Sequence, residues 1–222
     1  DLIDASYEDL YIVKSIVTSE LSEQLADVLN VKVYNVLTGF KYISEILNDK
    51  SHSKEKLLLA FEESNGYMAK PFVRDKDAIQ IVPLIIKYKN LLYENNITLK
   101  DTLDDIYRTI GHYHSINLSP VFEGAEGQHK IEEIINSFRN KTIHQVCGLD
   151  VKAIEDYQLG TIENIESGEK DATYLPNTNL IRLIFDEGFI AIRPSGTEPK
   201  IKIYFSLNVN NIENLIKEFK ET

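Results

Sequence analysis

A strand–helix–strand pattern near the start of the chain sets the fold class that it can adopt. Residues 11–18 are rich in β-branched side chains, which is typical of a buried strand. Ser19 is suited to cap a helix, and apolar residues then recur on one helical face up to Asn30. Residues 31–36 alternate in polarity like a second strand. The pattern predicts an α/β domain of the three-layer type, built on a mixed sheet.

The rest of the first half continues this pattern. Residues 57–61 form a short apolar run that predicts another strand, and Asp77 is positioned to cap a long helix. Helices are predicted over residues 41–47, 78–93 and 98–110. The buried face of the second helix is predicted to hold Ile79, Val82, Ile86, Leu91 and Leu92. We assign this first domain to residues 1–118.

The second half contains more strands than helices. A stretch with proline and glycine, residues 118–127, marks a boundary, so a second domain is assigned to residues 119–222. Residues 160–179 are polar and are expected to be mostly loop. Helices are predicted over 128–138 and 212–220, and strands over 151–157, 180–185, 189–192 and 201–207. These elements predict an α+β domain, in which an antiparallel sheet carries helices on one face.

Composition excludes several classes of function. The 222-residue chain has a formal net charge of -11, which argues against nucleic acid and anionic membranes as partners. A single cysteine excludes an internal disulfide and fits a reducing cytoplasm, the location that we expect. The longest strongly apolar run, residues 78–86, is too short to cross a bilayer. The chain starts at Asp1 without a methionine, and we expect it to be a piece of a longer protein.

The segment from Arg193 to Lys202 offers the groups that a phosphate needs. An apolar run leads into it and an alternating run leads out, so it is predicted to connect two strands. Arg193 carries a planar charged fork, and Lys202 adds a second positive charge. Ser195 and Thr197 supply hydroxyls, while Gly196 permits a sharp turn with inward-pointing amides. An ordinary hairpin turn explains the same residues, and spacing alone leaves both interpretations open.

Polar residues also follow the predicted strands of the first half, where open α/β sheets bind ligands. Thr38, Gly39 and Lys41 come after the second strand. Glu62 and Ser64 come after the third and, two residues apart in extended backbone, would face the same side. From the residues alone, a connecting turn and a solvated loop are the favoured explanations of these segments. Arg74 and Lys76 lie at a helix start, which is unfavourable for cations unless an anion is bound.

Four segments resemble motifs of one enzyme family. Arg-Pro-Ser-Gly-Thr-Glu-Pro-Lys at positions 193–200 resembles the phosphate-binding loop of the last domain in the α-D-phosphohexomutases, the phosphoglucomutase/phosphomannomutase superfamily. Three others are similar to motifs of the third domain and occur in the family's order: Thr-Gly-Phe-Lys at 38–41, Glu-Glu-Ser-Asn-Gly at 62–66 and Arg-Asp-Lys-Asp at 74–77. The resemblance covers nearly the whole chain and implies the C-terminal half of such an enzyme, its third and fourth domains.

The resemblance implies a reaction and a set of binding residues. The family interconverts hexose 1-phosphate and hexose 6-phosphate through a bisphosphorylated sugar, so a small phosphosugar is the implied partner. Sugar binding is implied for Thr38, Gly39, Lys41, Glu62, Ser64 and Lys76. Phosphate binding is implied for Arg193, Ser195, Gly196, Thr197 and Lys202. The acidic Glu63 beside Glu62 favours the phosphoglucomutase branch.

Two loops of the family do not occur in this sequence. They are the phosphoserine loop Thr-Ala-Ser-His-Asn-Pro and the magnesium loop Asp-x-Asp-x-Asp-Arg. We therefore expect no catalytic residue and no metal ligand here, and an inactive chain that binds no cofactor by itself. The resemblance implies that the full-length enzyme uses Mg²⁺, a hexose 1,6-bisphosphate activator and the N-terminal domains of the same chain. The alternative is a stand-alone, non-catalytic module that binds sugar phosphates.

Overall fold

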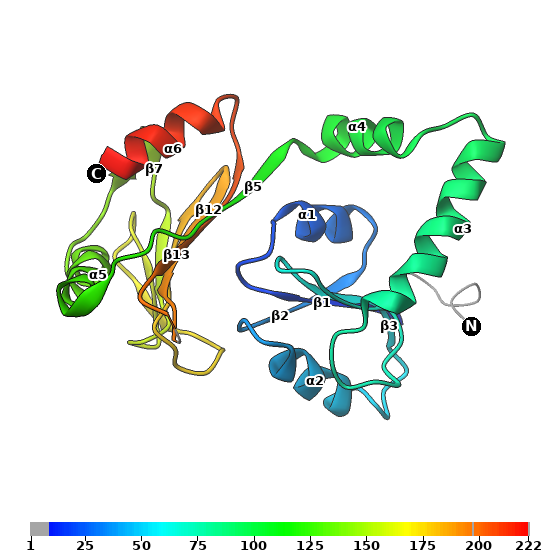
Figure 1. The fold of residues 1–222 in the computed structure, drawn as a ribbon, viewed down its shortest axis with the longest axis horizontal. Helices are drawn as coiled ribbons and strands as arrows, with labels where there is room; N and C mark the ends of the chain where they lie inside the picture. The colour runs from blue at the N-terminus through cyan, green and yellow to red at the C-terminus, as the bar shows by residue number, and fades with distance from the viewer. Residues whose placement is uncertain (1–8, 197, 222) are drawn as a thin grey trace. The chain divides into compact units, whose positions relative to one another are not determined.

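The computed structural model describes residues 9–196 and 198–221. The chain divides into two compact units, Asp1–His112 and Tyr113–Thr222 (Figure 1). This division precedes strand β5 (Tyr113–Leu118), whereas we expected the boundary after residue 118. The physical reason is strand pairing, because β5 pairs antiparallel with β13 (Ile201–Asn208) in the sheet of the second unit.

The first unit is a mixed sheet with helices on both faces, as expected. The strand order is β2-β1-β3-β4, in which β1 pairs parallel with β2 and β3, while β4 pairs antiparallel with β3. Helices α1 and α2 lie on opposite sides of this sheet (Figure 1). The bounds are β1 (Leu10–Ser15), α1 (Leu21–Val28), β2 (Lys32–Val36), α2 (Phe40–Asp49), β3 (Lys56–Glu62) and β4 (Gly66–Met68).

The remaining helices of this unit form where the sequence predicted them but are less buried. They are the short 3-10 helix η2 (Ala78–Gln80), α3 (Ile81–Glu94) and α4 (Leu99–Ile110). Asp77 caps η2, because its carboxylate accepts a hydrogen bond from the Ile79 amide at 3.1 Å. The predicted buried face is wrong: Leu92 is buried, but Ile79, Val82, Ile86 and Leu91 are all more than half exposed. The reason is that α3 lies beside the sheet instead of across one of its faces (Figure 1).

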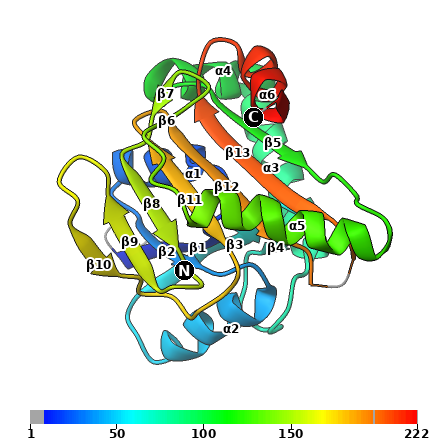
Figure 2. The ribbon, with the colours of Figure 1, turned by 90° about the vertical axis from the view of Figure 1, so that its left-hand side faces the viewer.

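The second unit is a seven-stranded antiparallel sheet with both long helices on one face, as predicted (Figure 2). The strand order is β10-β9-β8-β11-β12-β13-β5. Apolar side chains of α5 and α6 pack with those of the central strands in one core. The bounds are α5 (Gly124–Arg139), β8 (Ala153–Asp156), β11 (Ile181–Phe185), β12 (Gly188–Pro194) and α6 (Ile212–Glu221), and a small hairpin joins β6 (Gln145–Val146) to β7 (Leu149–Asp150).

The polar segment over residues 160–179 differs from the expectation. It contains strands β9 (Thr161–Asn164) and β10 (Lys170–Ala172), which extend the sheet beyond β8. The expectation of a loop failed because strands at an exposed sheet edge need no apolar side chains. Every residue of β10 is exposed, so its sequence carries no hydrophobic alternation.

Candidate functional site

Two of the predicted sugar-binding segments meet at the carboxyl ends of β2 and β3. Gly39 has a φ of 122° and stands directly before α2, and its amide donates to the Glu62 carboxylate at 2.6 Å. A positive φ of this kind is the reason for glycine at position 39. The contact also places a carboxylate at the positive end of the helix dipole, which is favourable. Residues far apart in the sequence are thereby fixed at one edge of the sheet.

The turn after Glu62 departs from the expected extended backbone. Residues 63–65 form the turn of the β3–β4 hairpin, so Glu62 and Ser64 are not successive same-side positions of a strand. The Ser64 hydroxyl donates to the neighbouring Glu63 carboxylate at 3.3 Å. Glu63 also accepts hydrogen bonds from the hydroxyls of Ser15 at 3.0 Å and Thr18 at 3.5 Å. The second acidic residue thus ties the hairpin to the end of β1.

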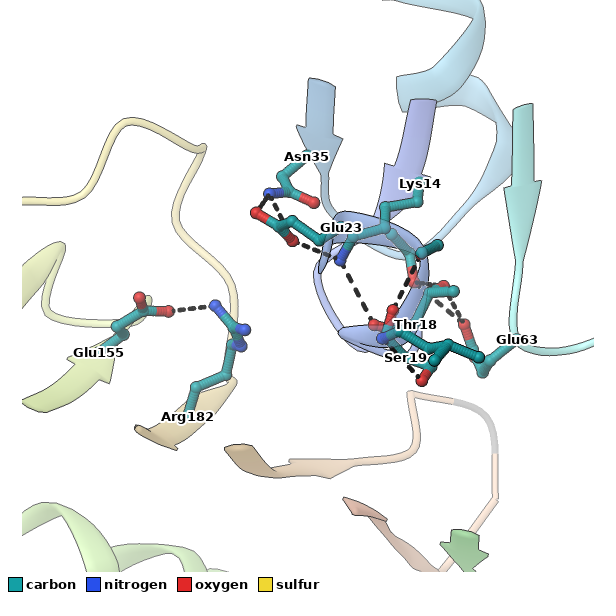
Figure 3. Close-up of polar contacts among 11 residues, drawn as sticks. Lys14, Thr18, Ser19, Glu23, Asn35, Glu63, Glu155 and Arg182 are labelled. Atoms are coloured by element: carbon teal, nitrogen blue, oxygen red, sulfur yellow. Dashed lines mark hydrogen bonds and ion pairs between the residues drawn. The ribbon is translucent and has the colours of Figure 1, made fainter. Parts of the chain in front are cut away.

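A buried polar cluster supports these loops (Figure 3). The Lys14 side chain is fully buried at the end of β1, and its ammonium group lies 3.0 Å from the Glu23 carboxylate. The same group donates to the Thr18 carbonyl at 3.4 Å, and Asn35 donates to Glu23 at 3.2 Å. The cluster joins β1, α1 and β2. Sequence reasoning missed it, although one signal was present, namely a lysine inside a β-branched run.

The two predicted lysines of this unit lie on exposed segments. Lys41, in the first turn of α2, extends over the Tyr42 ring, with its ammonium group 4.6 Å from the ring centre. Lys76 is exposed, and the next residue, Asp77, donates its amide to the Tyr67 carbonyl of β4 at 2.7 Å. The Arg74 carbonyl accepts from the Ser44 hydroxyl of α2 at 2.6 Å. The 74–77 segment is therefore anchored between β4 and α2.

In the second unit, the predicted phosphate loop joins β12 to β13 at the end of a regular hairpin. Arg193 and Lys202 are directly opposite each other in the ladder. Like charges in such a cross-strand pair are destabilising, so an anion bound between them would relieve repulsion. Arg193 also donates to the Tyr204 hydroxyl at 3.2 Å, which holds its guanidinium group. This arrangement favours phosphate over a neutral ligand.

The loop itself provides fewer free amides than expected. The Ser195 amide donates to the Lys200 carbonyl, and the Lys200 amide donates to the Glu198 carbonyl, both at 2.8 Å. Neither amide is available to an anion. Space is open at Gly196, where an added Cβ would meet no atom within 4 Å. Thr197 lies outside the described residues.

Side-chain charge in the loop is partly balanced from within. The Lys200 ammonium group lies 2.5 Å from the Glu198 carboxylate. This hydrogen bond lowers the pKa of Glu198 below its ordinary value. Glu198 therefore stays ionised and offsets Lys200, while the cross-strand cations Arg193 and Lys202 remain the groups best placed for an anion.

Metal ligands do not gather in the part of the chain that the structure describes. No three His, Cys, Asp or Glu side chains come together there, so these residues do not fit a Mg²⁺ site. No described helix combines the length and apolar character needed to cross a membrane.

Comparisons with known proteins agree with the expected family and fold. Residues 3–110 match the family described as phosphoglucomutase/phosphomannomutase, alpha/beta/alpha domain III. The chain is 56% identical over 211 residues to a phosphoglucomutase of Staphylococcus saprophyticus, a match that covers 95% of this chain and 38% of that protein. A phosphoglucomutase of Staphylococcus aureus is 45% identical over 207 residues, covering 93% of this chain and 37% of that protein. The chain thus spans well under half the length of these relatives.

Solved structures show the same fold at low sequence identity. The crystal structure of parafusin, a phosphoglucomutase from Paramecium, in its open form has a TM-score of 0.62 at 20% identity, covering 95% of this chain and 37% of that one. A putative phosphomannomutase from Thermus thermophilus has a TM-score of 0.58 at 14% identity, covering 95% and 36%.

Proposed function

Since this chain belongs to the phosphoglucomutase/phosphomannomutase superfamily, we propose that it supplies sugar and phosphate binding to a phosphoglucomutase. That enzyme interconverts hexose 1-phosphate and hexose 6-phosphate through a bisphosphorylated sugar in the cytoplasm. The observation that carries the proposal is the cross-strand pair of Arg193 and Lys202 beside an open loop. Two cations opposite each other do not stabilise a hairpin, but they do increase its affinity for an anion.

In the first unit, we assign hydroxyl recognition to the Glu62 region. One oxygen of the Glu62 carboxylate is held by Gly39, which fixes the orientation of the group toward a ligand at the sheet edge. Thr38 lies directly before Gly39, and Ser64 supplies a hydroxyl on the hairpin turn. A carboxylate and a hydroxyl can bind neighbouring hydroxyls of a hexose, which have similar positions in both orientations of the bisphosphate.

The lysines of the first unit would balance phosphate charge. Lys41 and Lys76 are both exposed, and each carries a flexible ammonium group that can follow a moving phosphate. In the second unit, Arg193, Ser195, Gly196, Thr197 and Lys202 would hold whichever phosphate is not reacting. The chain's own residues thus bind and orient the sugar, and they transfer no phosphoryl group.

The reacting groups would come from the N-terminal domains of the enzyme. We propose a phosphoserine as the phosphoryl carrier and a hexose 1,6-bisphosphate as the activator. Mg²⁺, when bound to the whole enzyme, would neutralise charge on the transferring phosphoryl group. These assignments make the enzyme a magnesium-dependent phosphoprotein.

A two-dimensional NMR titration with glucose 1,6-bisphosphate tests the binding role. We expect shifts in residues 193–202 and 38–41, and Arg193→Ala should weaken binding by about 10- to 100-fold, since charge-assisted hydrogen bonds contribute about 1.5–3 kcal/mol. Lys217→Ala is the matched control, because Lys217 is an exposed cation of the same unit on α6. Equal binding by Arg193→Ala and wild type would contradict the proposed phosphate site.

An activity assay tests whether this chain can catalyse the reaction by itself. We expect no conversion of glucose 1-phosphate by the purified chain, even with Mg²⁺ and glucose 1,6-bisphosphate present. Turnover that copurifies with the chain and disappears in Arg193→Ala would show that the chain is catalytically complete.

A further inference from the structure

A large apolar cavity, open to solvent on one side, lies in the second unit between the sheet and the two helices that cover it. Its volume is about 720 Å³. The walls come from α5, α6, β12, β13 and the segment after β5, and they include Leu118, Phe122, Ile134, Phe138, Ile203 and Phe219. Figure 2 shows α5 crossing the sheet over these strands.

The size and the lining of this cavity are those of a ligand site. Sites for small organic ligands have volumes of about 300–1,000 Å³ and mainly apolar walls. The cavity matches a ligand site in both respects, and the apolar walls call for a hydrocarbon group.

Two lysines line the cavity and indicate which polar group its ligand carries. Lys141 follows the end of α5, and Lys220 lies in the last turn of α6; both line the cavity, and both are exposed. Neither forms an ion pair within residues 9–196 and 198–221. In a chain with a net charge of -11, two such cations beside an apolar cavity indicate an anionic head group.

We propose that this cavity binds a free fatty acid with a chain of about twelve carbons. The hydrocarbon chain would lie against Phe122, Ile134 and Phe138, and the carboxylate would lie between Lys141 and Lys220. The site is independent of the proposed sugar-phosphate site, because it uses none of the same side chains. It adjoins that site through the backbone, since Ile192 and Ile203 line the cavity and flank the Arg193–Lys202 pair.

Dodecanoate labelled with ¹³C at the carboxyl carbon is the probe, used below its critical micelle concentration. We expect a separate, saturable carboxyl resonance at a one-to-one ratio. Lys141→Ala combined with Lys220→Ala should raise the Kd about tenfold, as expected for the loss of two exposed ion pairs. Lys217→Ala is the matched control, since Lys217 is on the same helix as Lys220 but does not line the cavity.

A blocking variant tests the cavity itself. Ser137 is exposed on α5 and lines the cavity, so Ser137→Phe should fill part of it without disturbing the core. We expect this variant to lose dodecanoate binding while its unfolding curve and its titration with glucose 1,6-bisphosphate stay as in wild type. Dodecyltrimethylammonium, which has the opposite charge, should bind at least about tenfold more weakly than dodecanoate.

Three results would overturn the proposal. The first is the absence of a saturable bound resonance, and the second is equal affinity for the cationic amphiphile. The third is dodecanoate binding that is unchanged in both the lysine double variant and Ser137→Phe. Failure of the sugar-phosphate titration alone would leave the fatty-acid site standing, because the two measurements use different residues.

Discussion

The two proposed binding regions, the sheet edge of the first unit and the β12–β13 hairpin of the second, differ in how their charged side chains are paired. At the sheet edge of the first unit, Glu62 is bonded to Gly39, and Glu63 is bonded to Ser15 and Thr18. In the hairpin of the second unit, by contrast, like charges face each other across the ladder. The first region keeps its shape through contacts within the protein. The second places two cations side by side, and we expect a bound anion to relieve their repulsion. The difference therefore predicts that the second region gains more from the ligand.

The largest effect should come from the cluster that supports the first region. Lys14→Met should lower the free energy of unfolding of the first unit by about 3 kcal/mol, because it leaves Glu23 without its buried partner. The loss of stability can be measured from the hydrogen-exchange protection of amides in β1, β2 and β3 at increasing urea concentrations. Lys54→Met, at an exposed lysine of the same unit, is the control and should have little effect.

A double variant distinguishes charge from packing at this position. Lys14→Met combined with Glu23→Gln should recover part of the lost stability, because no unpaired charge remains. If Lys14→Met alone were neutral, the first region would not depend on internal pairing, and the contrast between the two regions would fail.

Glu62→Ala should have a smaller but clear cost. It removes the acceptor of the Gly39 amide, and we expect a loss of about 2 kcal/mol, as for hydrogen bonds to charged groups. Glu62→Gln keeps an acceptor oxygen and should recover about half of that loss. The affinity of both variants for glucose 1,6-bisphosphate should also be measured. Glu62→Gln is the more stable of the two variants, so weaker binding by this variant would indicate that Glu62 contacts the ligand directly.

Charge balance in the first unit also predicts a pH dependence at Glu55. Lys32, Lys50 and Tyr34 donate hydrogen bonds to its carboxylate, and these contacts lower its pKa from 4.5 to about 2. The stabilisation is therefore full above the unfolded pKa and is lost as the pH falls toward 2. Glu55→Gln should cost about 1 kcal/mol near neutral pH, as for a small ion-pair network.

The measurement is the difference in unfolding free energy between wild type and Glu55→Gln as a function of pH. This difference should shrink as the pH falls from about 5 toward about 2. A difference that stays constant over that range would show that the Glu55 contacts contribute through packing instead of charge.

Sequence reasoning predicted the elements well where side chains alternate between a buried and an exposed face. β1, β2, β12 and β13 all have such patterns or continuous apolar runs. It failed for β10, whose residues are all exposed, and for the buried face of α3, because a helical pattern does not say which surface will cover it. The contact between Gly39 and Glu62 was also beyond reach, since nothing local to either residue encodes a pairing across the sheet edge.

The smallest effect is the one that tests the second region directly. Lys202→Gln should raise the free energy of unfolding of the unliganded second unit by about 0.5 kcal/mol, because it removes the like charge opposite Arg193. The same variant should weaken binding of glucose 1,6-bisphosphate. Lys170→Gln is the matched control: Lys170 faces the oppositely charged Glu163 across β10 and β9, so its loss should lower stability slightly instead. A second unit that is less stable in Lys202→Gln would mean that the hairpin carries no repulsion for a phosphate to relieve, and the proposed contrast in charge between the two regions would fail.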